Sequence, residues 1–421
     1  MKKVKIEQGL KYNTKKFEIY IRLINNIIEK NIIKLKYFFY SLLLLLIIII
    51  LLIDIFYLSN IKIISLKPFK KYVNDCKRFK SYNLQKIKKD NPFLSVCLSA
   101  LNMEKYIVQN LLSILNQSFQ DFEIIIVNDN SKDNTKYIIN KMQLKDDRIK
   151  IVNHNKNLGV YRSRMESILN AKGKYIILMD PDDMFLNENL FKELYNYNIN
   201  INIDITEFSV FQQIEGRRKI FFPNNHFENH YHNFSKNIIY QPELSNLLYY
   251  LPGTKEYSHT ICRNIWNKMI NKKIFLNMYD YLGIDYYNQF IITADDMLMN
   301  IIIYEYAKNY SNIELPGYLY NIRKVSMSRG DGGIELHKIR TINHYYYFKI
   351  FYKYIKEFNK DRNYLFYEMK NLNHYILYIK DFNLTKFIKK EIKIIKEIRD
   401  DKYISSDFKN YSQNLLLYFE K

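Results

Sequence analysis

From Phe93 onward, short apolar runs alternate with stretches in which apolar residues recur at helical spacing. Four of the runs predict buried strands, over residues 93–99, 122–127, 148–152 and 175–179. The stretches between them predict three helices, over 103–116 after an Asn102 cap, from about Asp133, and over 158–171 with Gly173 as the stop. This alternation predicts an α/β domain with an open, mainly parallel sheet flanked by helices, whose ligands bind beyond the carboxyl ends of the strands.

The pattern is weaker in the C-terminal part of the chain. Residues 261–275 and 297–306 have the spacing of helices, and residues 318–322 predict a closing strand. Beyond Gly330 to Gly333 the chain is aromatic and rich in lysine, which predicts a helical C-terminal extension over residues 331–421.

A long apolar run precedes the α/β pattern, from Tyr37 to Leu58, and only Asp54 interrupts it. At about 1.5 Å per residue a helix of this length spans about 33 Å, enough to cross a bilayer. A long charged leader and the lack of a small-residue cleavage site after the run argue against a cleaved signal peptide. A buried soluble helix is the alternative to a transmembrane helix.

The flanks of this run carry most of the positive charge. Residues 1–36 and 59–92 have net charges of +7 and +8, out of +21 for the whole chain. The sequence therefore predicts a basic N-terminal tail (1–36), a transmembrane helix (37–58), a basic stalk (59–91), the α/β domain (92–330) and the C-terminal extension (331–421). We expect a single-pass membrane protein, and the flanking charges leave its orientation undecided.

Composition excludes several classes of protein. A hydrophobic content of 48% excludes a disordered chain, and three cysteines are too few for a disulfide framework. Since the basic residues bracket the apolar run instead of forming a stripe on the folded domain, no nucleic-acid partner is expected.

The strongest chemical signal is Asp180-Pro181-Asp182-Asp183, directly after the fourth predicted strand. Two carboxylates at this spacing in a turn can converge on one Mg²⁺ or Mn²⁺ ion, and such an ion can neutralise a leaving diphosphate. The same residues also suit the start of a helix, which leaves simple capping as the alternative.

Several motifs together resemble the family 2 glycosyltransferases, which are inverting, nucleotide-sugar-dependent enzymes with the GT-A fold. The motifs are Leu94 to Asn102, Asp121 to Ser131, Asn157-Leu158-Gly159, Ala171 to Ile176, Asp180 to Asp183, Ile265 to Met269 and Ala294 to Leu298. The match is dense over residues 92–190, returns more weakly over 259–328, and covers neither end of the chain.

The resemblance implies a role for each matched residue. Donor-binding positions fall on Ser99, Asp129, Arg164 and Asp180, with Asp129 accepting the uracil N3–H and Arg164 contacting the diphosphate. Asp182 is the implied ligand of Mg²⁺ or Mn²⁺, and Asp296 the implied general base. Trp266 is either part of an acceptor site or a core residue.

The sequence thus predicts a membrane-anchored glycosyltransferase that moves a sugar from a nucleotide diphosphate donor, UDP-linked, to a hydroxyl of a glycan, lipid or protein acceptor with inversion. The alternatives are an inactive binding protein with the GT-A fold and, less favoured, a membrane-tethered nucleic-acid binder.

Overall fold

The structure is a computed structural model. It describes residues 90–215, 220–221, 238–241, 244, 264–323, 333–358 and 360, and a few short pieces between 392 and 417. All of these residues belong to one unit, Tyr82–Lys421. None of the helices within these ranges is long and apolar enough to cross a membrane. The predicted tail (1–36), transmembrane helix (37–58) and nearly all of the stalk (59–91) lie outside the described residues.

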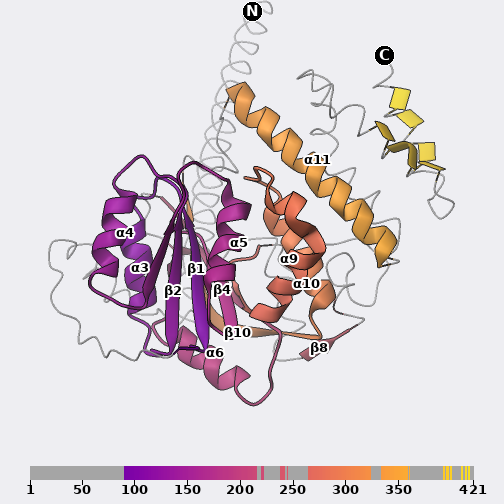
Figure 1. The fold of residues 1–421 in the computed structure, drawn as a ribbon. Coiled ribbons are helices and arrows are strands. Elements are labelled where there is room, and N and C mark those ends of the chain that lie inside the picture. Colours follow the sequence, from indigo (N-terminus) through magenta and orange to yellow (C-terminus); the bar gives the residue numbers. More distant parts are fainter. Residues whose placement is uncertain are drawn as a thin grey trace, which may run out of the picture. The chain divides into compact units, whose positions relative to one another are not determined.

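The four predicted strands form one half of a single sheet, and each begins and ends within one residue of its predicted bounds. They are β1 (Leu94–Ala100), β2 (Phe122–Asn128), β3 (Ile149–Asn153) and β4 (Tyr175–Met179). They are mutually parallel in the order β3-β2-β1-β4, so their carboxyl ends meet at one edge (Figure 1). The sequence predicted this half correctly.

The other half makes the sheet mixed, which corrects the prediction of a mainly parallel one. Its order from β4 is β9-β6-β10-β5, with β7 and β8 at the side. These strands are β5 (Met184–Phe185), β6 (Ile205–Ile214), β7 (Ile220–Phe221), β8 (Ile238–Tyr240), β9 (Lys268–Asn271) and β10 (Asn309–Ile322). Because β9 lies antiparallel between β4 and β6, the parallel run ends there. Among the described strands, five pairings are antiparallel and four parallel.

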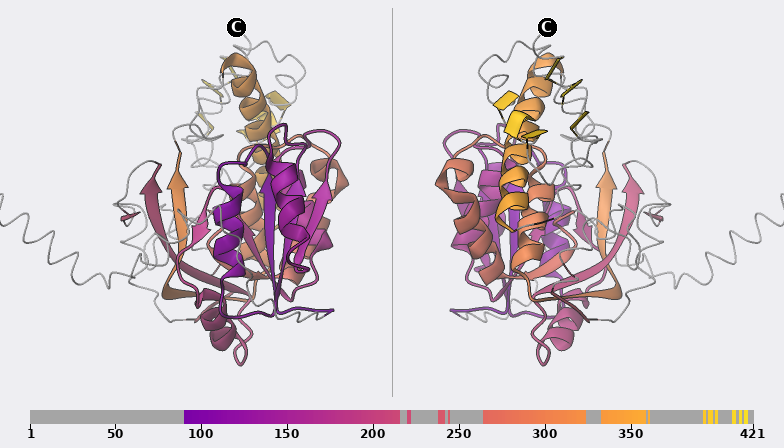
Figure 2. Two further views of the ribbon diagram at one scale, coloured as in Figure 1. Left: turned by 90° about the vertical axis from the view of Figure 1, so that its left-hand side faces the viewer. Right: turned by 90° about the vertical axis from the view of Figure 1, so that its right-hand side faces the viewer.

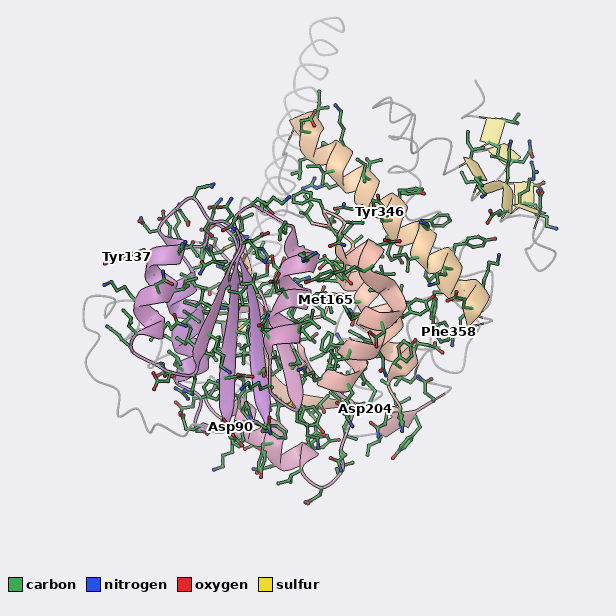
Figure 3. All side chains as sticks on the ribbon, viewed as in Figure 1. Asp90, Tyr137, Met165, Asp204, Tyr346 and Phe358 are labelled. Carbon is green, nitrogen blue, oxygen red and sulfur yellow. The ribbon has the colours of Figure 1, made fainter. Side chains whose placement is uncertain are left out.

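Helices cover both faces of the sheet. One apolar cluster joins one face to α3 (Ile107–Leu115), α4 (Thr135–Gln143) and α6 (Leu190–Asn198). The other joins the opposite face to α5 (Val160–Asn170), α9 (Lys272–Tyr287), α10 (Asp295–Tyr306) and α11 (Gly333–Glu357). Figure 2 shows α11 on the side of the sheet that carries α9 and α10. In Figure 3, Met165 lies inside this second layer, whereas Tyr137 on α4 is 64% exposed.

Two helix boundaries differ from the prediction. The first helix begins at Ile107, because Asn102 has a φ of 55° and its side chain instead accepts a hydrogen bond from Lys132 N. Residues 261–275 are not one helix, because Lys268–Asn271 is the buried strand β9, and α9 follows directly after it.

Gly173 has a different role from the predicted helix stop. Helix α5 ends at Asn170, before an extended Ala171. A Cβ on Gly173 would lie 2.6 Å from the backbone nitrogen of Ser95, so only glycine fits against β1. Its own N–H donates to Ser95 Oγ at 2.8 Å, which ties the chain before β4 to the start of β1.

Candidate active site

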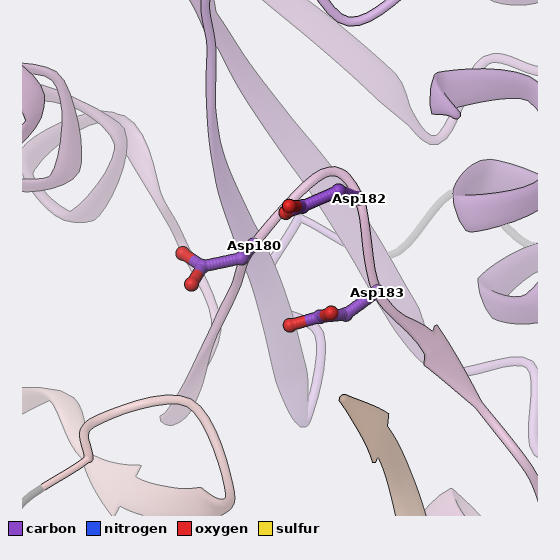
Figure 4. A group of neighbouring side chains, drawn as sticks. All are labelled: Asp180, Asp182 and Asp183. Atoms are coloured by element: carbon purple, nitrogen blue, oxygen red, sulfur yellow. The ribbon is translucent and has the colours of Figure 1, made fainter. Parts of the chain in front are cut away.

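Three aspartates line the turn that follows β4. One carboxylate oxygen each from Asp180, Asp182 and Asp183 lies within 4.8 Å of the others, and Figure 4 shows the side chains around one turn. Asn110 of α3 holds this turn from behind, since its side-chain amide donates to the carbonyl oxygens of Asp180 (3.0 Å) and Asp183 (2.9 Å). The predicted cluster therefore forms at the carboxyl end of β4.

Residues at the end of β10 contact two of these carboxylates. Arg323 Nε forms an ion pair with Asp182 Oδ2 at 2.5 Å. Asp183 accepts hydrogen bonds from Tyr318 Oη (2.6 Å) and Asn321 N (2.8 Å). Asp183 is buried by these contacts, whereas Asp180 and Asp182 are only half-buried.

Burial and mutual repulsion raise the pKa values in this turn. Burial, with the charge of Asp180, raises the pKa of Asp182 to about 6, although Arg323 opposes the rise. Burial, with the charges of Asp182 and Asp180, raises the pKa of Asp183 well above its usual range. A cluster of carboxylate oxygens is the hard ligand set that Mg²⁺ and Mn²⁺ prefer. The residues present therefore fit such an ion, with Asp182 and Asp180 the more accessible ligands.

Two further carboxylates begin α10, after Ala294 in the left-handed conformation (φ 64°). The Asp295 side chain is 6% exposed and that of Asp296 is 28% exposed, so only Asp296 can reach a bound molecule without rearrangement. Desolvation raises the pKa of Asp296 to about 7, with Arg164 opposing and Asp295 adding to the rise. A carboxylate with this pKa can act as a general base near neutral pH.

Arg164 of α5 joins these two groups of carboxylates. Its Nη1 donates to Asp295 Oδ2 at 2.6 Å and also to Asp296 Oδ1, while its Nη2 donates to Asp180 Oδ1 at 2.7 Å. Burial alone would lower the pKa of Arg164, but the three carboxylates raise it well above its ordinary value. The residue expected at the diphosphate thus contacts acidic side chains in the structure.

Asp129 follows β2, at the same edge of the sheet and on the other side of β1. Its Oδ1 accepts hydrogen bonds from His154 Nδ1 (2.7 Å) and Leu158 N (2.8 Å), and its Oδ2 from Gly159 N (3.0 Å). The opposite ring nitrogen of His154 lies 2.7 Å from Glu166 Oε2. Hydrogen bonding to Asp129, opposed by burial and reinforced by Glu166, raises the pKa of His154. Asp129 is thereby held as a hydrogen-bond acceptor.

Ser99 lies at the carboxyl end of β1, beside Val127 of β2, and is half-buried. Trp266 is 5% exposed and its ring stacks on Tyr318 (centroids 4.5 Å apart) and Tyr320 (5.4 Å). Of the two interpretations of Trp266, the structure favours the core residue.

Sequence reasoning missed three residues of the site. They are Arg323, Tyr318 and His154, whose side chains contact Asp182, Asp183 and Asp129. Only His154 had a local signal, because it follows the third strand directly and precedes Asn157-Leu158-Gly159. Arg323 and Tyr318 lie more than 130 residues from their partners along the chain.

The chain is similar to several known proteins. Residues 95–275 match the family model described as Glycosyl transferase family 2. An uncharacterized glycosyltransferase of Haemophilus influenzae is 38% identical over 103 residues, which are 24% of this chain and 41% of that protein. The putative teichuronic acid biosynthesis glycosyltransferase TuaG of Bacillus subtilis is 34% identical over 103 residues, with the same coverage.

A third relative is the GalNAc(5)-diNAcBac-PP-undecaprenol beta-1,3-glucosyltransferase of Campylobacter jejuni, 36% identical over 97 residues, which are 23% of this chain and 31% of that protein. The chain thus spans about two fifths or less of the length of these relatives. Among solved structures, S. aureus TarS 1–349 is similar with a TM-score of 0.49 and 16% identity, over 77% of this chain and 88% of that one.

Proposed function

Residues 95–275 are a family 2 glycosyltransferase domain, and on that premise we propose that the protein transfers a sugar from a nucleotide diphosphate donor to an acceptor hydroxyl with inversion. The observation that carries the proposal is that Arg164 connects the aspartates of the turn after β4 with the aspartates that begin α10. A mixed α/β sheet with its chemistry at the carboxyl edge of the parallel strands agrees with a GT-A fold.

We propose that the donor is UDP-linked. Donors from the protein are directed at both Oδ1 and Oδ2 of Asp129, so this side chain is oriented as a hydrogen-bond acceptor. Such a group suits the N3–H of uracil, which cytosine lacks. Ser99, beside it at the end of β1, completes the nucleotide side of the site.

In the proposed reaction, Asp296 accepts the proton of the acceptor hydroxyl while the hydroxyl oxygen bonds to the anomeric carbon. The bond from that carbon to the diphosphate oxygen breaks, and its electron pair leaves with the nucleoside diphosphate. Asp182 and Asp180 would hold Mg²⁺ or Mn²⁺, which when bound neutralises the charge that develops on the diphosphate. Inversion requires the base and the leaving group to lie on opposite faces of the sugar.

The acceptor and the cellular site are proposed from the sequence. The names of two relatives refer to teichuronic acid biosynthesis and to an undecaprenol-linked glycan, which supports a glycan or glycolipid acceptor over a protein one. We propose that the run Tyr37–Leu58 anchors the chain in a membrane. If so, full-length protein stays with the membrane after washes with high salt and with carbonate, and release by salt alone would contradict the anchor.

The enzymatic proposal is tested with the full-length protein in detergent micelles. A panel of UDP-, GDP- and CMP-sugars is screened for thermal stabilisation with and without Mn²⁺, and each stabilising donor for release of its nucleotide. Stabilisation by UDP-sugars with metal-dependent release of UDP is expected. Binding without release, in the presence of varied glycan acceptors, would favour the inactive binding protein. Salt-dependent retention of DNA without donor binding would favour the nucleic-acid binder.

A further inference from the structure

Arg164 is buried where three segments of the chain meet. Only 8% of its side chain is exposed, and its partners come from the turn after β4 and from the first two residues of α10. Asp180 lies 16 residues away in sequence, and Asp295 and Asp296 lie 131 and 132 residues away. One guanidinium therefore bridges parts of the site that the chain itself does not link closely.

These contacts occupy both terminal nitrogens of Arg164. Nη1 is shared by Asp295 and Asp296, and Nη2 is directed at Asp180. A diphosphate oxygen could reach Nη1 only by displacing a carboxylate from a buried, charge-assisted hydrogen bond, and at Nη2 it would have to share the nitrogen with Asp180. Such an exchange is costly, because the displaced carboxylate would stay in a poorly solvated place without its counter-charge.

We propose that Arg164 is a positioning residue, which sets Asp296 relative to Asp180 and does not bind the donor diphosphate. This inference rests on the proposed function, since it assigns Asp296 the role of base and Asp180 a place on the donor side. The planar fork of a guanidinium can hold carboxylates on two sides at fixed angles, whereas the single ammonium of a lysine cannot. A single side chain thereby sets the distance between Asp296, the proposed base, and Asp180 on the donor side.

The test compares Arg164→Gln and Arg164→Lys with the wild type, each as full-length protein. Steady-state transfer gives kcat and the donor KM, and calorimetric titration gives the affinities for UDP and for UMP with Mn²⁺. Since misplacing a base by about 1 Å can cost about 100-fold, kcat should fall on that order in Arg164→Gln. The affinity for UDP should change by less than about 3-fold, because no phosphate contact is lost. Arg164→Lys should recover only part of kcat.

A second readout separates positioning from a loss of folded protein. Asp296 is surrounded by the charges of Arg164, Asp295 and Asp180, and of these only Arg164 favours its ionised form. Arg164→Gln should therefore move the acid limb of the kcat profile to higher pH, whereas a lower fraction of folded enzyme would leave the profile unshifted. Arg148→Gln is the matched control, since Arg148 also pairs with a buried carboxylate, Asp146 at 2.7 Å, on the opposite edge of the sheet.

Two results would overturn the inference. One is a fall of UDP affinity in Arg164→Gln to that of UMP, which would make the arginine a diphosphate ligand. The other is an unchanged kcat in that variant. If Arg164→Gln fails to fold, the double variant Arg164→Gln/Asp295→Asn removes a buried carboxylate together with its partner and takes the same measurements. A wild type that neither binds UDP nor turns over refutes the proposed function instead.

Discussion

Tyr318 Oη donates a 2.6 Å hydrogen bond to Asp183 Oδ2, although the two residues lie 135 positions apart. The same hydroxyl accepts a hydrogen bond from Asp180 N at 3.2 Å. Trp266 stacks on the ring of Tyr318 and fixes its plane. The aspartate turn is therefore supported from β10 by one phenol, which bonds to a side chain and to the backbone.

We expect Tyr318→Phe to destabilise the protein by about 1–3 kcal/mol, because it removes the donor to Oδ2 of the buried Asp183 side chain and leaves only Asn321 N, which donates to Oδ1. The turn should also hold a metal less well, so the Mn²⁺ concentration needed for half-maximal UDP binding should rise. Denaturant unfolding and Mn²⁺-dependent titration of UDP check the two effects. Tyr137→Phe is the control, since Tyr137 is 64% exposed on α4. Equal stability of the two variants would contradict this role of Tyr318.

The parallel half of the sheet could be predicted because its signals are local. Each strand is a short apolar run, such as 122–127, and each is followed by polar residues that end it. The other half could not, apart from the predicted strand 318–322, which forms the end of β10. Strand β9 has only four residues and is followed directly by α9. The apolar residues of the strand therefore cannot be distinguished, by their spacing, from those of the helix. Strand β10 contains Pro316, and its pairing with β6 shifts register around that residue, which breaks the alternation of apolar and polar positions.

The candidate site, like the sheet, could be predicted only in part. The aspartates themselves were found from sequence, because each stands at a strand end or a helix start. Their partners could not be found, since the contacts of Arg164 with Asp295 and of Arg323 with Asp182 depend on how distant segments pack. The family resemblance implies a diphosphate contact for Arg164, and only the three-dimensional structure shows that its charge faces acidic side chains.

The two acids that begin α10 should behave differently. Asp296→Asn should lower transfer by at least about 100-fold, as expected for a lost general base, while UDP affinity stays near the wild-type value. Asp295→Asn should act first on stability, because Asp295 is buried against Arg164 at 2.6 Å. Transfer assays and thermal unfolding of both variants check this. Retention of most transfer by Asp296→Asn would place the base elsewhere.

Activity and stability should respond to pH in opposite directions. The pKa of Asp296 is about 7, above its ordinary value of 3.8. As a base it must be ionised, so kcat should fall as the pH drops below about 7. The folded state binds this proton more tightly than the unfolded state does, so the contribution of Asp296 to stability falls as the pH rises from about 4 to about 7.

A pH series of kcat and of thermal unfolding without divalent ions checks these two directions. Loss of activity at pH 6 in a protein that is at least as stable there as at pH 8 fits titration of the base. Loss of both together would show unfolding instead. In Asp296→Glu, which keeps a titratable carboxyl, any residual activity should still have an acid limb.

Asp182→Asn tests the metal site. The substitution keeps the size of the side chain and removes its charge, so UDP binding should lose most of its dependence on Mg²⁺ or Mn²⁺. Titration of UDP with the metal and with EDTA measures this dependence. Asp285→Asn is the control, since Asp285 is exposed on α9. If Asp182→Asn keeps the wild-type metal dependence, Asp182 is not the ligand, and the same titration of Asp183→Asn becomes the next test.

Gly159 joins the nucleotide side of the site to the segment that leads into α10. Its N–H donates to Asp129 Oδ2 at 3.0 Å, and its φ is +91°, a conformation that side chains rarely adopt. A Cβ there would lie 2.6 Å from the carbonyl oxygen of Ile291, which itself accepts a hydrogen bond from Tyr161 N. Ile291 stands a few residues before Asp295 and Asp296. The close packing of the Ile291 backbone against Gly159 therefore also positions the start of α10.

Gly159→Ala should therefore add a clash to the backbone strain, and Gly283→Ala separates the two effects. Gly283 also has a positive φ, +74°, but a Cβ there meets no atom within 4 Å. Gly283→Ala should cost about 1–3 kcal/mol of strain and leave transfer near the wild-type rate, because it only forces a residue with a side chain into a positive-φ extended conformation (φ 74°, ψ 169°) that is essentially restricted to glycine. Gly159→Ala should cost more stability and also lower kcat, since the backbone that carries Asp296 must move. Denaturant unfolding and transfer assays of the two variants make the comparison. Equal stability and equal kcat in both would mean that the contact between Gly159 and Ile291 does not position the base.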